Sequence, residues 1–355
     1  MKPGEIFIYV VALGAVAGVL AYGDILRNWY THNDQKTEYD LIRTYLLNDT
    51  PLYGNNKPKL WVHSKYELNA RRWKSFQSRT STDLNQPYLH MTIQSIVNQC
   101  GEDFHVCLID DESFSKLIPS WDVDMKMLPD PLRSTMRQIG LTSLVYYFGG
   151  MVVPDSFLCM RSLLPLYQRA SHDKPFVAER LNRTTNILHE NKRPQLFIAD
   201  AYFMGARKND AAVLEYLEYI KDQNRVPHFS SEHNIVGNNS WWLENASREG
   251  KFVRLDGGII GVKTLDGNAI LIEDLLGEDY LNIEPHVFGI YIPEDELLKR
   301  TQYQWFSVMS SDQILSSRLI LAKYLAASTI ESNKPSNTSS NVPQALDSVD
   351  RIVVV

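Results

Sequence analysis

The sequence has few cysteines, no cluster of basic residues and none of the short motifs that mark common enzyme classes. Its three cysteines, Cys100, Cys107 and Cys159, lie in apolar surroundings, so we predict buried, reduced thiols rather than a disulfide framework or a zinc site. The formal net charge of −6 gives no general attraction to nucleic acid. A P-loop, a GxSxG turn and an HExxH motif are all absent from the sequence.

The first long feature is an uncharged apolar run from Ile6 to Tyr22. As a helix it would span about 25 Å at ~1.5 Å per residue, which is at the short end for crossing a bilayer. We therefore expect a transmembrane anchor within residues 1–27. A cleaved signal peptide and a buried soluble helix are the alternatives. Gly14 and Gly18 form a small-xxx-small pair that would let a partner helix approach closely.

The rest of the chain divides into three parts that differ in composition. Residues 28–58 contain turn-forming sequences and are expected to form a stalk. Residues 59–327 carry strand and helix patterns and are expected to form the globular domain, for which 355 residues leave ample length. Residues 328–355 are rich in Ser, Asn and Pro and are predicted to be a low-complexity tail. A single-pass protein in a Golgi- or ER-type lumen fits this plan best, with another membrane or a virion as alternatives.

The globular part begins with a strand–helix–strand pattern. Lys59–His63 predicts a buried strand, Gln86–Gln99 a helix, and Phe104–Ile109 a second strand that ends at Asp110 and Asp111. Acids at the end of such a strand are typical of the opening of a parallel α/β sheet. We therefore predict an α/β fold in which a mixed sheet is flanked by helices.

Further elements are predicted along the chain by the same periodicities. The expected strands are Phe176–Glu179, Leu196–Ala199, Arg254–Val262, Ala269–Ile272 and Val287–Ile292, and the expected helices are Asn209–Lys221 and Asp312–Ala327.

The segment from Arg133 to Tyr167 carries the most specific pattern. Apolar residues at helical spacing lead to Gly149 and Gly150, which end the helix because glycine adopts the positive φ of a C-cap. Met151–Val153 then predicts a short strand, and Asp155 follows its end. A polar residue at the carboxyl end of a strand in an α/β domain lies where such folds bind ligands.

Several segments, taken in order, resemble one enzyme family. They are PKLWVH (58–63), NQPYLHMTIQSIVNQC (85–100) ahead of FHVCLIDD (104–111), the helix–Gly–Gly–strand segment, and ADAYFMGARKNDAAVLEYLEYI (199–220). Residues 59–327 thus resemble the GT-A-fold sugar transferases of the family-32 and capsular-polysaccharide-synthesis type, whose members carry a DXD motif. The resemblance implies a nucleotide-sugar-binding α/β sheet and retaining transfer of a hexose with Mn²⁺ or Mg²⁺. It also implies an N-terminal membrane helix, as many eukaryotic members have.

The chain departs from that family at four site positions. The two DXD acids align with Pro154 and Ser156, and Asp155 stands between them. An Asp and an Arg that hold the sugar in the family align with Gln138 and Leu141. One carboxylate can still serve a Mg²⁺ that is held mainly by phosphate and water. Leucine in place of arginine removes a bidentate contact.

Five residues are therefore the candidate site residues. Asp155 is predicted to bind the metal and, with Asp200, to take part in catalysis; Asp110, Asp111 and Arg137 are predicted to lie near the nucleotide and its diphosphate. Each has an ordinary structural alternative: an N-cap for the acids after Phe104–Ile109, a turn for Asp200 and a salt bridge for the arginine. Weaker candidates are Asp122 with Asp124, Arg133, the histidines His228 and His233, and the tryptophans Trp241 and Trp242.

Two functions follow from this pattern. The first is a membrane-anchored hexosyltransferase that moves a sugar from a nucleotide sugar to a glycan or another acceptor. The second is a catalytically degenerate domain that serves as a structural or binding subunit of a membrane or viral assembly. An enzyme should show several acids converging on an open polar cleft beside Asp155, whereas a scaffold should show that cleft filled by side chains such as Leu141 or Phe157.

Overall fold

The computed structural model describes residues 57–65, 68–70, 80–84, 86–182, 195–225 and 232–331. Two compact units make up the chain. The first, comprising residues 1–48 and 68–83, contributes to the described part a two-stranded sheet of β2 (Leu68–Ala70) and β3 (Thr80–Leu84). The second comprises residues 49–67 and 84–355 and holds the elements described below.

The expected anchor at residues 1–27, with Gly14 and Gly18, and nearly all of the expected stalk lie outside the described residues. No helix within the described ranges has the length and apolarity needed to cross a bilayer.

A six-stranded mixed sheet forms the centre of the second unit. Its order is β4 (His105–Ile109), β1 (Lys59–His63), β5 (Gly150–Pro154), β8 (Phe197–Ala206), β7 (Phe176–Leu181) and β9 (Val253–Leu255). β8 runs opposite to the other five strands, which are mutually parallel. The predicted α/β class with a mixed sheet is confirmed, and the carboxyl ends of β1, β5 and β7 lie at one edge of the sheet.

Two glycines set the register of β5 against β1. Gly149 ends the preceding helix with φ +71° and its carbonyl accepts a hydrogen bond from Nε1 of Trp61 at 3.0 Å. Gly150 has φ +95°, and a Cβ there would lie 2.1 Å from the carbonyl oxygen of Lys59. Only glycine permits this close approach, so the turn predicted from the sequence is confirmed with a specific steric cause.

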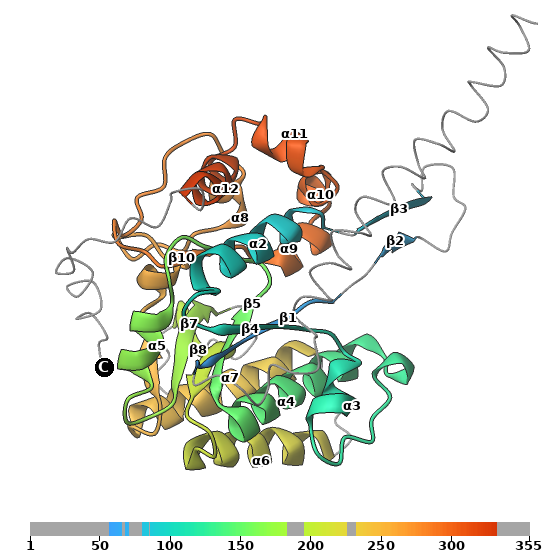
Figure 1. The fold of residues 1–355 in the computed structure, drawn as a ribbon, viewed down its shortest axis with the longest axis vertical. Helices are drawn as coiled ribbons and strands as arrows, with labels where there is room; N and C mark the ends of the chain where they lie inside the picture. Colours follow the sequence, from blue (N-terminus) through green and yellow to red (C-terminus); the bar gives the residue numbers. More distant parts are fainter. Residues whose placement is uncertain are drawn as a thin grey trace, which may run out of the picture. The chain divides into compact units, whose positions relative to one another are not determined.

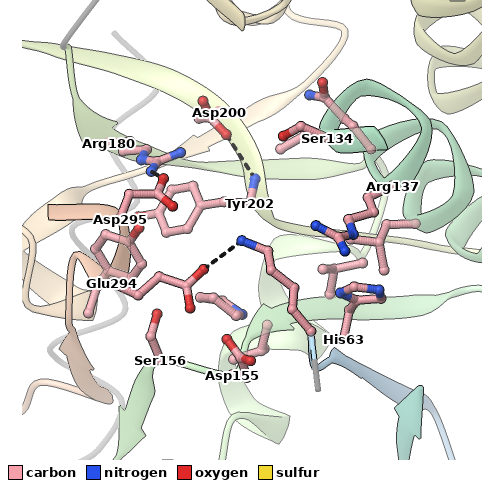
Figure 2. A pocket seen from close by; sticks show the side chains of 18 of the residues that line it. His63, Ser134, Arg137, Asp155, Ser156, Arg180, Asp200, Tyr202, Glu294 and Asp295 are labelled. Carbon is pink, nitrogen blue, oxygen red and sulfur yellow. Dashed lines mark hydrogen bonds and ion pairs between the residues drawn. The ribbon is translucent and has the colours of Figure 1, made fainter. Parts of the chain in front are cut away.

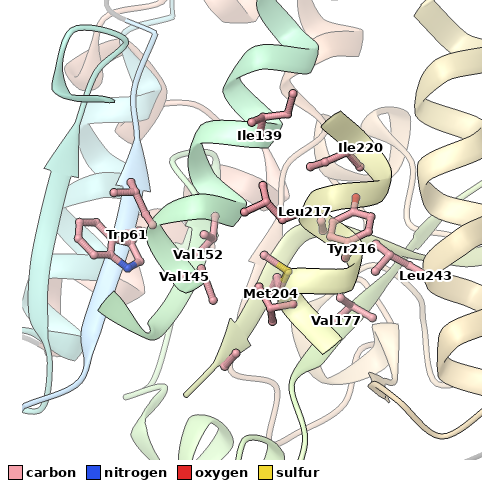
Figure 3. Close-up of a cluster of buried hydrophobic side chains, with 14 of the residues drawn as sticks. Trp61, Ile139, Val145, Val152, Val177, Met204, Tyr216, Leu217, Ile220 and Leu243 are labelled. Atoms are coloured by element: carbon pink, nitrogen blue, oxygen red, sulfur yellow. The ribbon is translucent and has the colours of Figure 1, made fainter. Parts of the chain in front are cut away.

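Helices cover both faces of the sheet (Figure 1). α4 (Asp130–Phe148), α6 (Ala211–Arg225) and α7 (Glu232–Arg248) lie on one face, and α2 (Tyr88–Cys100) lies on the other. Figure 3 shows the core between the sheet and the first three helices. Its buried side chains include Trp61, Val145, Val152, Met204, Tyr216, Leu217 and Leu243.

A second buried cluster forms on the α2 side. The strand β6 (Phe157–Cys159) pairs antiparallel with β10 (Gly289–Tyr291), and short helices pack around this pair and α2. These helices are α8 (Ile272–Leu275), α9 (Glu294–Lys299), α10 (Gln304–Ser307), α11 (Ser311–Leu315) and α12 (Ile320–Glu331). The remaining helices of two turns or fewer are α3 (Ser113–Leu117) and α5 (Leu164–Ala170).

Three predicted elements differ in the structure. The strand expected at Arg254–Val262 ends with β9, because the Asp256 carboxylate accepts a hydrogen bond from the Gly258 N–H and starts the 3-10 helix η2 (Gly257–Ile260). Ala269–Ile272 forms one isolated bridge and then enters α8. The single helix expected at Asp312–Ala327 is divided between α11 and α12.

Helix α7 was not predicted, because its sequence is rich in asparagine and contains a glycine, which are both poor helix formers. The packing of α7 against the sheet offsets this low helix propensity. All three cysteines are buried and free, as predicted, with the sulfur atoms of Cys100 and Cys159 3.8 Å apart.

Candidate functional site

A pocket of about 210 Å³ lies at the edge where β1, β5 and β7 end. Its walls come from segments far apart in the sequence, and Figure 2 shows their polar side chains pointing toward a shared space. Its charged and titratable lining residues are His63, Lys65, Arg137, Asp155, Arg180, Asp200, Tyr202, Tyr291, Glu294 and Asp295. Carboxyl ends of parallel strands are the usual ligand-binding edge of an α/β sheet.

Asp155 lies at one corner of the pocket, in the turn between β5 and β6, and is 5% exposed. Its carboxyl group shares a hydrogen bond with Glu294 at the start of α9. Lys65, just after β1, donates a hydrogen bond to Glu294, with 3.1 Å between Nζ of the lysine and Oε1 of the glutamate. Burial raises the pKa of Asp155 well above its usual value, and the Glu294 carboxylate raises it further, while Lys65 opposes both. Burial and the bond to Glu294 therefore favour the protonated form of Asp155.

Another part of the pocket wall is formed by an arginine that lies beside two tyrosine rings. The Arg180 guanidinium lies 5.4 Å from the ring centre of Tyr202 and 5.8 Å from that of Tyr291. The two rings are 4.9 Å apart. Asp295 pairs with the arginine at 3.6 Å, and its side chain is 47% exposed. This is the loosest ion pair of the pocket, so Arg180 is the cation whose partner a ligand anion can most readily replace.

Asp200, in the middle of β8, is held in place by neutral donors. Its Oδ1 accepts a hydrogen bond from the Tyr202 N–H at 3.0 Å, and Oδ2 accepts one from the Ser240 hydroxyl at 2.9 Å. The residue is 7% exposed and lines the pocket. It is thus a fixed acceptor group at the pocket wall. The expected strand Leu196–Ala199 continues to Ala206, so Asp200 lies within β8 and not at a strand end as predicted.

Asp111 stands behind the pocket, bound to two of its lining residues. Arg137 donates to both carboxylate oxygens, from Nε at 2.8 Å and from Nη2 at 2.7 Å, and Nε2 of His63 lies 2.9 Å from Oδ1. Burial alone would raise the pKa of Asp111, but these hydrogen bonds outweigh it and hold the pKa well below its usual range. Burial lowers the pKa of His63, which is consequently neutral at pH 7 and donates from Nε2.

Other candidates have structural roles instead. Asp110 takes the capping alternative, because its Oδ1 accepts hydrogen bonds from the N–H and the hydroxyl of Ser113 at the start of α3. Arg133 donates to the carbonyls of Met125 and Leu128. Asp124 accepts from the N–H of Lys126. None of these residues lines the pocket.

The two tryptophan candidates do not line the pocket. Trp242 packs on Tyr219 and Tyr216 in the core, and Trp241 does not line the pocket. His228 lies outside the described residues, as does the side chain of His233.

Gln138 and Leu141 on α4, which the resemblance aligns with the family's sugar-holding Asp and Arg, both line the pocket. Gln138 is bound to the neighbouring helices: its Nε2 donates to the Tyr216 hydroxyl at 2.8 Å, and its Oε1 accepts from Nδ2 of Asn239 at 2.8 Å. These bonds join α4 to α6 and α7. The Gln138 side chain is therefore a contact between helices.

The donors near Asp155 do not fit the Mn²⁺ or Mg²⁺ that the family implies. Divalent cations need ionised carboxylates or other hard oxygen ligands, whereas burial and Glu294 favour the protonated form of Asp155. The resemblance aligns the two DXD acids with Pro154 and Ser156, which offer no carboxylate, and the described residues contain no group of three metal-ligating side chains. A metal at this corner would also meet the Lys65 ammonium, which pairs with Glu294.

Sequence reasoning missed Lys65, Arg180, Glu294 and Asp295. The rule that identified Asp111 and Asp155, a charged group just beyond a strand, applies to each of them. Arg180 follows the expected strand Phe176–Glu179, and the two acids follow the expected strand Val287–Ile292. A comparison of the chain with protein families, curated proteins and solved structures finds no match.

Proposed function

We propose that the pocket binds a nucleotide sugar and that the protein is a sugar transferase of GT-A-like architecture. The observation that carries the proposal is the convergence of acids and bases from β1, β5, β7, β8 and α9 on one polar pocket at the carboxyl edge of the sheet. This is the cleft expected of an enzyme, and it is not filled by Leu141 or Phe157. The order of the sequence segments that resemble family-32 transferases supports the same function.

Different parts of the pocket suit different parts of such a ligand. Arg180 offers a guanidinium whose carboxylate partner is half-exposed, so a diphosphate can take the place of Asp295. Lys65 is a second cation, on the other side of the pocket. Arg137, predicted to contact the diphosphate, holds Asp111 with a bidentate pair that is mostly buried. We therefore assign the anion contact to Arg180 ahead of Arg137.

In transfer, the bond from the anomeric carbon to the diphosphate breaks as the acceptor oxygen bonds to that carbon. The nucleoside diphosphate leaves with the electron pair, and its leaving oxygen takes the proton that the acceptor hydroxyl loses. Cations beside the leaving group stabilise its developing charge. Arg180 is placed for that role, and Asp200 is a fixed acceptor for a hydroxyl of the sugar or of the acceptor. Membrane attachment and a lumenal site of action are part of this proposal.

A second candidate function is a degenerate domain that serves as a structural or binding subunit. Gln138 favours it, because the residue at a sugar-holding position is fully engaged with Tyr216 and Asn239. The ion pairs of Lys65 and Arg180 also neutralise the pocket without a ligand. In that function the partner would be another protein of a membrane or virion.

Binding experiments distinguish the two functions. The melting temperature of the full chain is measured with UDP, GDP and a panel of UDP- and GDP-hexoses, in Mn²⁺, in Mg²⁺ and in EDTA. We expect at least one nucleotide sugar to raise it in EDTA and to be cleaved to the nucleoside diphosphate when an acceptor is present. Binding without cleavage supports a degenerate domain that still holds the sugar. The absence of binding by every donor contradicts the transferase and supports a structural subunit.

A variant pair ties any binding to the pocket. Arg180→Lys keeps the charge but loses the planar guanidinium that lies against the rings of Tyr202 and Tyr291. We expect its affinity for the nucleoside diphosphate to fall about tenfold, a difference of about 1.4 kcal/mol. Arg225→Lys changes an exposed arginine on α6 that pairs with Asp222, and it should bind like the wild type. Equal affinities for the two variants would place the diphosphate elsewhere.

A further inference from the structure

Ser156, directly after Asp155, has an unusual environment. The residue is completely buried and lines the pocket, yet its hydroxyl oxygen has no hydrogen-bond partner in the described part of the protein. Its backbone is fixed, since its carbonyl accepts a hydrogen bond from the Ile292 N–H at 3.1 Å. Buried hydroxyls are nearly always paired in folded proteins, so one that lacks a partner at a pocket wall calls for a ligand group.

The neighbours of this hydroxyl define what it can bind. Figure 2 shows Ser156, Asp155 and Glu294 at the same side of the pocket. The two acids share a hydrogen bond, and Lys65 donates to Glu294. One proton and one ammonium group thus balance two carboxyl groups, which leaves this corner close to neutral. Burial, which raises the pKa of Asp155, favours the same state. This corner therefore suits an uncharged ligand group that can both donate and accept hydrogen bonds.

The remaining shape of the pocket indicates the rest of the ligand. Tyr202 and Tyr291 present aromatic rings to the same space and Asp200 presents fixed acceptors. A volume of about 210 Å³ lies below the about 300–1,000 Å³ that encloses a drug-sized ligand. The pocket therefore has room for one sugar ring, with apolar C–H groups over the tyrosines and hydroxyls toward the acids, and the nucleotide would extend outside it.

We propose that Asp155, Ser156 and Glu294 form a subsite for hydroxyl groups of the transferred sugar, in place of a metal–diphosphate site, with the Ser156 hydroxyl bonded to one of them. The inference rests on the proposed function and deepens it. Ser156, at one of the two positions that the resemblance aligns with DXD acids, then contacts the ligand directly. Sugar binding therefore does not require a divalent cation.

The test compares Ser156→Ala with Ser115→Ala, which removes an exposed hydroxyl on α3 that does not line the pocket. Affinities for UDP- and GDP-hexoses and for UDP and GDP are measured by titration calorimetry in EDTA. We expect Ser156→Ala to weaken the nucleotide sugar about tenfold and to leave the nucleoside diphosphate unchanged. Ser115→Ala should change neither. The melting temperature of Ser156→Ala should be at least that of the wild type, because the variant loses an unpaired buried group.

Two results would overturn the subsite while leaving the proposed function in place. One is equal affinity of Ser156→Ala and wild type for every nucleotide sugar that binds. The other is binding that disappears in EDTA and returns with Mn²⁺. If no nucleotide sugar or nucleoside diphosphate binds the wild type, free hexoses are tested by saturation-transfer NMR. Ser156-dependent hexose binding would then uphold the subsite and refute the transferase, and no hexose binding would refute both.

Discussion

Arg137 on α4 and Asp111 after β4 form a bidentate ion pair, with N···O distances of 2.8 and 2.7 Å. The pair joins a helix to the end of a strand immediately behind the pocket. Both side chains are mostly buried, at 15% and 23% exposure. His63 donates to the same carboxylate and stacks on Phe114 with ring centres 5.5 Å apart. The back wall of the pocket is therefore rigid, and its stability depends on one carboxylate.

The first prediction concerns that carboxylate. Asp111→Asn leaves the Arg137 guanidinium without its charged partner, and we expect a loss of about 2 kcal/mol at pH 7 by urea denaturation. Because the pKa of Asp111 is lower in the folded than in the unfolded state, its contribution is complete above the unfolded pKa of about 4. It is lost as the pH falls toward the folded pKa.

The difference between wild type and Asp111→Asn should therefore shrink below about pH 4. Asp173→Asn is the matched control, since Asp173 also pairs with a histidine but is 80% exposed. That variant should unfold like the wild type at every pH. A difference for Asp111→Asn that stays constant down to pH 2 would contradict the ionic origin of the stabilisation.

Asp155 should show the opposite pH dependence. Its pKa is higher in the folded than in the unfolded state, so the contribution of Asp155 to stability is most favourable below about pH 4 and declines as the pH rises toward the folded pKa. In Asp155→Asn the amide stays neutral, and its NH₂ can donate to Glu294 as the protonated acid does. We expect the melting temperature of the variant to match or exceed that of the wild type at pH 8 and to show no advantage at pH 4. If the variant is less stable than the wild type at pH 8 but not at pH 4, Asp155 is ionised and held by Lys65.

A glycine pair tests the steric basis of the turn before β5. Gly150→Ala places a Cβ against the Lys59 carbonyl at a φ of +95°, and we expect a loss of more than about 2 kcal/mol or failure to fold. Gly267 has a similar φ of +81°, but nothing lies within 4 Å of a Cβ built there. Gly267→Ala should cost only the conformational strain, about 1 kcal/mol. Equal losses by thermal unfolding would mean that the Lys59 contact is not decisive.

A buried ion network beside the pocket gives the fourth prediction. The Glu179 carboxylate accepts hydrogen bonds from Arg254, from Lys263 at 2.7 Å and from the Gly257 N–H at 2.9 Å. Its backbone carbonyl also accepts from the hydroxyl of Tyr202, which lines the pocket. Burial alone would raise the pKa of Glu179, but these partners lower it.

Glu179→Gln leaves two cations without this partner, and we expect a loss of about 3 kcal/mol or more in urea denaturation. Glu215→Gln, which breaks an exposed pair with Lys251, should leave stability unchanged. A small loss for Glu179→Gln would indicate that Glu244 and Asp256 alone satisfy Arg254 and Lys263.

The sequence predicted β1, α2, β4, α4 and β5 well because their apolar spacing is strong and the glycine turn has one steric solution, whereas β2 and β3 were not predicted. The strand-end rule led to Asp155 and the central helix to Arg137, and both line the pocket. Asp200 lines it too, although it lies within β8 and not at a strand end. The sequence could not predict the raised pKa of Asp155, because that pKa depends on burial and on Glu294, which approaches from a distant segment. It also placed Asp110 near the nucleotide, where a local hydrogen bond to Ser113 prevails.

Lys65 and Glu294, which face each other in the pocket, are separated by 229 positions in the chain. The second residue is brought there by β10, a strand of three residues whose partner is β6. Contacts between such distant segments form late in folding because the intervening chain must first be ordered. A nascent chain emerging from the ribosome would therefore contain most of the sheet before it contained a complete pocket. Ligand binding would then indicate that the whole polypeptide has been made and has folded.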